Sequence, residues 1–76
     1  MNRKEFLNGL QEELELEVKL TEDTNFKELE EWDSMNAMVL IGYVSNNFNV
    51  NLNAEDIKSM STISSLIKRI GEEKFN

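Results

Sequence analysis

This chain of 76 residues contains no cysteine, no histidine and no proline. Without cysteine there is no disulfide, no thiolate metal site and no cysteine nucleophile, and such a composition suits a reducing cytoplasm. Without histidine the commonest general base is missing, so only carboxylates, lysines and the single tyrosine, Tyr43, remain for proton transfer. We therefore expect a protein that has no catalytic residues and no metal site of its own.

Long apolar runs are also absent. The longest extends from Ala37 to Val44, with Gly42 inside it, and is far shorter than the roughly 20 residues that cross a bilayer. The positively charged start is followed by Glu5 and a mixed polar pattern, not by the apolar core of a secretory signal. We expect one cytoplasmic domain, residues 1–76, with no membrane insertion.

Charge is distributed unevenly along the chain. Residues 1–33 contain eleven acidic and four basic side chains, a net charge of −7, whereas residues 34–76 are neutral overall. No charged residue occurs from Ser34 through Ala54. An acidic surface repels phosphate backbones and anionic lipid, which disfavours nucleic acid and favours basic patches on partner proteins. The alternative is that the acidic residues bind no partner and only keep a small domain soluble.

The first half of the chain reads as a helix followed by a long loop. An amphipathic helix is predicted over about residues 3–16, because apolar residues recur there at spacings of three and four. These residues are Phe6, Leu7, Leu10 and Leu14. From Val18 to Trp32 no period persists, and we expect a loop held against the core by apolar anchors. The proposed anchors are Leu20, Phe26, Leu29 and Trp32.

A second helix is predicted from Ser34 to about Asn47. Its expected core stripe is Met35, Met38, Ile41, Val44 and Phe48, with Leu40 widening it. We expect the methionines, Met60 included, to be adaptable core residues. Two apolar residues, Val39 and Tyr43, fall off this stripe.

The last third of the chain predicts two further helices. An asparagine-rich turn holds Val50 and Leu52 as inward anchors, and Asn53 then caps a short helix through about Ser59. Thr62 caps a last helix that ends before Gly71 and has the apolar stripe Ile63, Leu66, Ile67 and Ile70. The predicted fold class is all-α: a small bundle of three main helices plus one short helix, with the long loop between the first two main helices.

A serine stands where the acidic segment ends and the uncharged helix begins. Asp33 and Ser34 are both favourable N-cap types, and an acid at a helix start meets the positive end of the macrodipole. By themselves these two residues therefore need no functional explanation. The order of the residues around them, however, suggests a function for Ser34.

The chain resembles the acyl carrier protein family over nearly its whole length. The segment Leu29 to Met35, LEEWDSM, with the apolar helix that ends at Phe48, looks like the prosthetic-group attachment site of that family. The remaining parts also follow in family order: the leucine-rich first helix, the anchored loop, Phe48-x-Val50-x-Leu52, the acidic short helix, and Ser61-Thr62-Ile63 at the start of the last helix.

By this resemblance, Ser34 carries a 4′-phosphopantetheine arm and is flanked by Asp33 and Met35. The arm comes from coenzyme A through a phosphopantetheinyl transferase, and its thiol holds acyl groups as thioesters for enzymes that load and transfer them. A helix N-terminus suits the anionic phosphodiester. Since the chain has no histidine to activate Ser34, the base and any magnesium must belong to the transferase.

The chain departs from carriers of fatty acid synthesis on the second helix. Those carriers usually have an acid directly after the Asp-Ser-aliphatic triplet and more acids along the helix, whereas this chain has Asn36 and no acid as far as Ala54. We expect partner binding to depend less on charge and more on apolar contacts and hydrogen bonds. The candidate contact residues are Asn36, Val39, Tyr43, Glu55 and Asp56.

The resemblance implies a stand-alone, monomeric acyl carrier for a specialised pathway, such as polyketide, modified-lipid or surface-sugar acylation. A carrier for housekeeping fatty acid synthesis and a carrier of an activated amino acid are alternatives. A different class is an acidic, non-enzymatic helical adaptor without cofactor, in which Ser34 is only a cap. An enzyme would require an acid and base pair, or weak cation ligands, among Glu30, Glu31 and Asp33.

Overall fold

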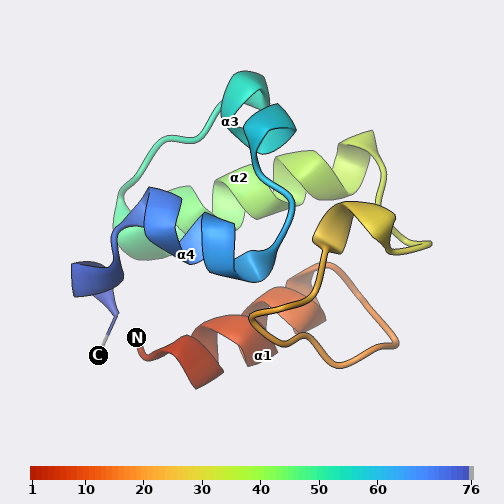
Figure 1. Ribbon diagram of the computed structural model, residues 1–76, viewed down its shortest axis with the longest axis horizontal. Helices are drawn as coiled ribbons and strands as arrows, with labels where there is room; N and C mark the ends of the chain where they lie inside the picture. The colour runs from red at the N-terminus through yellow and green to blue at the C-terminus, as the bar shows by residue number, and fades with distance from the viewer. Residues whose placement is uncertain (76) are drawn as a thin grey trace.

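The computed structural model describes residues 1–75, in which helices are connected by loops and a single isolated β-bridge. The helices are α1 (Arg3–Glu13), η1 (Phe26–Glu28), α2 (Ser34–Phe48), α3 (Ala54–Ser59), α4 (Ile63–Ile70) and η2 (Glu72–Lys74), where η denotes a short 3₁₀ helix. The predicted all-α class, with three main helices and a short one, is confirmed (Figure 1). None of the described helices is both long and apolar enough to cross a membrane.

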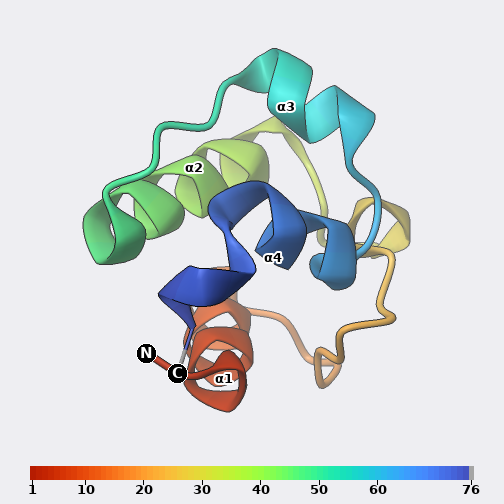
Figure 2. The same ribbon diagram turned by 60° about the vertical axis from the view of Figure 1, so that its left-hand side comes forward.

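The helix α4 lies at the centre of the domain. Figure 2 shows it surrounded by α1, α2 and α3. Its predicted stripe is buried: Ile63, Leu66, Ile67 and Ile70. These residues belong to one hydrophobic core that also takes in Phe6 and Leu10 of α1 and Leu40 of α2.

Local capping explains where the short helices begin. The side chains of Asn53 and Thr62 each accept the backbone N–H of the residue three positions later, and the side chain of that residue accepts the backbone N–H of the cap in return, which completes a capping box. Both predicted caps are therefore confirmed. The helix α1 ends at Glu13, earlier than predicted, because Glu15 adopts a left-handed conformation with φ of 54°. Leu14 and Leu16 remain buried on either side of this turn.

The predicted long loop is anchored as expected. Leu20 and Phe26 are buried, while Leu29 and Trp32 pack partly against the core. The rings of Phe26 and Trp32 meet edge-to-face with centroids 4.9 Å apart. At the other end of the domain, Arg3 pairs with Glu22 of the loop at 2.9 Å and with Glu72 of η2 at 3.2 Å, which links both ends of the chain to this loop.

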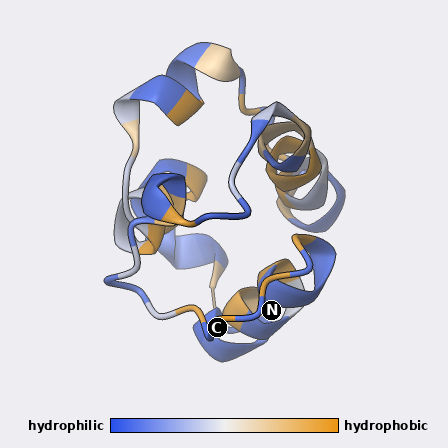
Figure 3. Cartoon of the chain, turned by 90° about the vertical axis from the view of Figure 1, so that its right-hand side faces the viewer, coloured by the Kyte–Doolittle hydropathy of each residue, from blue (hydrophilic) through white to orange (hydrophobic). Residues whose placement is uncertain are grey.

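The predicted core stripe of α2 is wrong at Met35 and Met38. Met35 and Met38 are each 73% exposed, whereas Leu40 and Val44 are 1% and 0% exposed. At about 100° per residue, the side of the helix that holds Leu40 and Val44 is opposite the side that holds Met35 and Met38. Figure 3 shows that α2 is mostly hydrophobic while α1 is mostly hydrophilic. The helix α2 is therefore apolar on two faces, and only one faces the core. The prediction for Met60 is confirmed, since it is buried.

Val39 and Tyr43 are closer to the core than predicted, because both pack partly against it. The Tyr43 ring lies 5.8 Å from that of Phe6, and its hydroxyl lies over Gly9 of α1. Burial raises the pKa of Tyr43, and the carboxylates of Glu13 and Glu12 raise it further. Gly9 is thus the point at which α1 makes room for a side chain of α2.

Alanine substitutions at Gly9 and Gly42 should therefore have different effects. Gly42 lies in α2 with open space around it, so Gly42→Ala should raise the free energy of unfolding by about 0.5–1 kcal/mol. Gly9→Ala places a methyl group against the Tyr43 hydroxyl and should give no gain. Chemical denaturation measures the free energy of unfolding of the two variants. Each glycine substitution is also combined with Tyr43→Phe, which removes the hydroxyl that lies over Gly9. Equal gains at both glycines would contradict the packing described here.

Candidate functional site

The start of α2 is fixed by Asp33 and Asn36. Asp33 is the N-cap in an extended conformation, and its carboxylate accepts the backbone N–H of Asn36 at 2.8 Å. The Asn36 side chain donates to the carbonyl of Glu31 at 2.8 Å, which fastens the end of the loop onto the first turn of the helix. Ser34, the first residue of α2, is left with an exposed side chain.

The loop that leads to Ser34 is held by the start of α4. The Phe26 N–H donates to the carbonyl of Ser61 at 3.1 Å, and the Ile63 N–H donates to the carbonyl of Thr24 at 3.0 Å. A third bond joins the Ser64 N–H to the carbonyl of Glu22 at 2.8 Å. These bonds fix one end of the loop, and the Phe26–Trp32 contact fixes the other, next to Asp33.

The electrostatics at Ser34 suit an anion. At the first turn of α2, the N–H groups of Asn36 and Ala37 bond to the side chain and carbonyl of Asp33, respectively. The N–H groups of Ser34 and Met35 have no protein acceptor within residues 1–75. Free N–H groups at the positive end of a 15-residue helix favour a phosphate group by about 0.3–1 kcal/mol when exposed.

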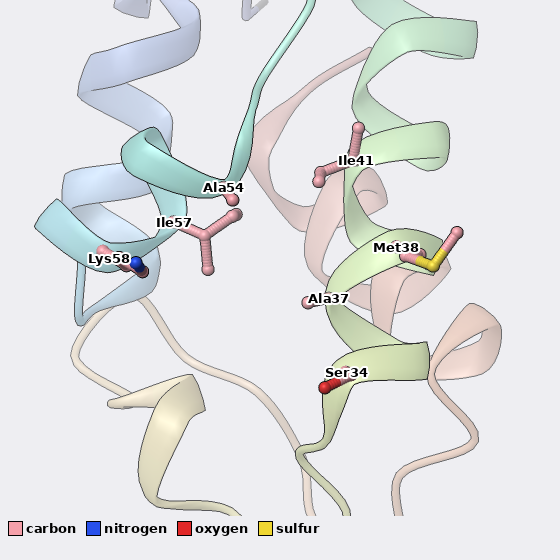
Figure 4. A pocket seen from close by; sticks show the side chains of 7 residues that line it. All are labelled: Ser34, Ala37, Met38, Ile41, Ala54, Ile57 and Lys58. Carbon is pink, nitrogen blue, oxygen red and sulfur yellow. The ribbon is translucent and has the colours of Figure 1, made fainter.

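A cavity of about 330 Å³ opens beside Ser34, between α2 and α3. Its lining residues are Ser34, Ala37, Met38 and Ile41 from α2, and Ala54, Ile57 and Lys58 from α3 (Figure 4). Apart from Ser34 and the ammonium of Lys58, these side chains are apolar. The cavity can therefore receive an apolar group whose polar end lies at Ser34.

The helix α3, which forms one wall of the cavity, is held at both ends. At its start, Asp56 completes the Asn53 capping box and pairs with Arg69 of α4 at 3.2 Å. At its end, the Lys27 ammonium donates to the carbonyls of Ile57 at 3.2 Å and Lys58 at 3.0 Å. The hydrogen bond from Arg69 lowers the pKa of Asp56, and the bond to the Asn53 backbone lowers it further.

The Asp56 interaction predicts a dependence of stability on pH. Because the folded pKa lies below the ordinary value of 3.8, ionised Asp56 stabilises the fold above that value, and this contribution is lost as pH falls through the folded pKa. Asp56→Asn should lower the stability at neutral pH, and the stability of this variant should fall less than that of the wild type as the pH is lowered. Glu55→Gln should change neither the stability at neutral pH nor its decrease with pH. Thermal unfolding between about pH 7 and pH 3 tests this. Identical acid sensitivity in the wild type and Asp56→Asn would contradict it.

The predicted site residues lie in different environments. Ser34, Asp33 and Met35 are exposed together at the start of α2, as is Glu55 on α3. Asn36, Tyr43 and Asp56 are partly buried and already have hydrogen-bond or packing partners in the fold. No cluster of three or more carboxylates among residues 1–75 could hold a metal ion. Sequence reasoning missed Lys58, whose place at the cavity depends on how α3 packs.

Comparison with known families identifies the group that this site fits. A family model described as "Phosphopantetheine attachment site" matches residues 4–70. The chain therefore belongs to the phosphopantetheine-binding family, whose members carry covalently attached 4′-phosphopantetheine, and the resemblance and cofactor inferred from the sequence are confirmed. No curated protein and no solved structure matched the chain. An exposed serine hydroxyl, two free N–H groups and an adjacent apolar cavity are compatible with this cofactor.

Proposed function

We propose that this protein is an acyl carrier and that Ser34 bears the 4′-phosphopantetheine arm. One observation carries the assignment to Ser34: its exposed hydroxyl lies at the N-terminus of α2 and on the edge of the apolar cavity. An arm attached there begins next to free N–H groups that favour its phosphate. An acyl chain on the arm can be sheltered between α2 and α3.

The attachment reaction needs a partner enzyme. The Ser34 oxygen attacks the phosphorus of coenzyme A that bears pantetheine, an oxygen–phosphorus bond forms, and the diphosphate bond breaks. The leaving group is adenosine 3′,5′-bisphosphate, and the hydroxyl proton passes to a base of the transferase. Asp33 is the nearest carboxylate in sequence, but it is engaged by the Asn36 N–H. We therefore assign no catalytic residue to this chain.

The arm supplies a thiol that forms thioesters with acyl groups, and the chain has no cysteine with which that thiol could be confused. The residues of the protein then hold the arm, cover the acyl group and present both to partner enzymes. Ala37, Ile41 and Ile57 are suited to cover an alkyl segment, because they line the cavity with hydrocarbon. We propose a cytoplasmic, monomeric, single-domain carrier that acts in a specialised acyl pathway.

The exposed face of α2 supports the specialised role. Met35 and Met38 present flexible apolar side chains to solvent directly beside Ser34, on a helix without charge. A partner that reads this face gains more from apolar contact than from charge steering. Met35, Val39 and Glu55 are the contacts that we propose here. Asn36, Tyr43 and Asp56 contribute by holding α2 and α3 in position.

Modification at Ser34 is tested by intact-mass analysis. After incubation with coenzyme A, magnesium and a phosphopantetheinyl transferase, the wild type should gain one phosphopantetheine, and Ser34→Ala should gain none. Ser45→Ala, which changes a serine later in the same helix, is the matched control and should be modified normally. Failure of several competent transferases to modify the wild type would contradict the carrier function and favour an adaptor without cofactor.

The apolar character of the recognition surface is tested by binding to the transferase. Met35→Ala and Val39→Ala should each weaken binding by about fivefold or more, since each removes buried apolar area at the contact. Glu55→Lys should change it by less than about twofold, because an exposed ion pair contributes little. Titration calorimetry at low and high salt gives these values. A steep salt dependence would show that charge steering dominates instead.

A further inference from the structure

Lys58 is the one charged residue among the seven that line the cavity beside Ser34. It lies on α3, across the cavity from Ser34 on α2 (Figure 4). The α2 wall has no charged side chain, and Asp33, next to Ser34, is acidic. A phosphodiester on Ser34 would therefore have a carboxylate beside it in sequence and the Lys58 ammonium across the cavity.

The ammonium of Lys58 is available for a new partner. Within residues 1–75 its one ion pair is with Glu55, at 4.0 Å, and both side chains are largely exposed. Such a pair is worth little, so a better placed anion can replace it. Lys27, the other lysine near this wall, is different because its ammonium already donates to two carbonyl oxygens of α3.

The backbone that carries Lys58 is also fixed. Lys27 bonds to the carbonyl of Lys58 itself, and the Asp56–Arg69 pair holds the preceding turn against α4. The long side chain of Lys58 can thus move at its tip while its base stays in place. This combination suits a residue that meets a tethered anion.

We propose that Lys58 binds the phosphodiester of the arm and draws the start of the arm across the mouth of the cavity toward α3. Lys58 is then a positioning residue that acts together with the free N–H groups of Ser34 and Met35. A consequence is that the arm leaves Met35, which is exposed and does not line the cavity, uncovered for partner enzymes. This inference rests on the attachment of the arm to Ser34.

The test uses phosphorus NMR of the arm-bearing protein, with modification of each sample first verified by intact mass. The variants are Lys58→Gln, Lys58→Arg and, as a matched control on an exposed lysine of α4, Lys68→Gln. Lys58→Gln should shift the phosphodiester resonance and remove its dependence on salt concentration. Lys58→Arg and Lys68→Gln should retain the wild-type salt dependence.

A second measurement compares the acetylation rate of each lysine in the unmodified and arm-bearing wild-type protein, read by peptide mass spectrometry. Attachment of the arm should slow acetylation at Lys58 and leave Lys68 unchanged. A phosphorus resonance that is the same in Lys58→Gln and wild type, or an unchanged rate at Lys58, overturns the role of Lys58 and leaves the attachment at Ser34 intact. Absence of any modified protein overturns both proposals.

Discussion

The position of Ser34 depends on the attachment of the long loop to the start of α4. Three backbone hydrogen bonds connect residues 22–26 to residues 61–64, and the contact of Phe26 with Trp32 passes this constraint to the residues before Ser34. Without these contacts the loop between α1 and α2 would adopt many conformations, and holding it in one of them would be entropically unfavourable. The cavity wall formed by α3 is held separately, by the bonds from Lys27 and by the Asp56–Arg69 pair, so the cavity beside Ser34 depends on both sets of contacts.

The helix α2 has apolar side chains on two faces, one in the core and one exposed to solvent. Leu40 and Val44 pack in the core, whereas Met35 and Met38 face solvent beside Ser34. Surface methionines are adaptable and form contacts with little geometric demand, which suits a carrier that meets several enzymes. The helix α2 carries no charged side chain, whereas the cavity has one ammonium group, that of Lys58. We propose that binding the arm and contacting partners are therefore tasks of different residues. In our proposal Lys58 binds the arm, while the exposed Met35, outside the cavity lining, contacts partner enzymes.

Sequence patterns predicted the features that local chemistry determines. Asn53 and Thr62 act as caps because capping involves residues three positions apart, and the stripe of α4 is buried because its spacing leaves one consistent face. The burial of α2 was harder to predict, because apolar residues occur on both sides and periodicity alone cannot say which side meets α4. Lys58 escaped prediction for a related reason, since its role at the cavity requires two segments that meet only in the folded chain.

The attachment of an arm to Ser34 is the central claim, and the protein isolated from the cells that make it tests this claim most directly. Tandem mass spectrometry of its peptides should locate 4′-phosphopantetheine on Ser34, with the other serines unmodified. Protein that carries no arm in those cells, or an arm on a different serine, would contradict the account.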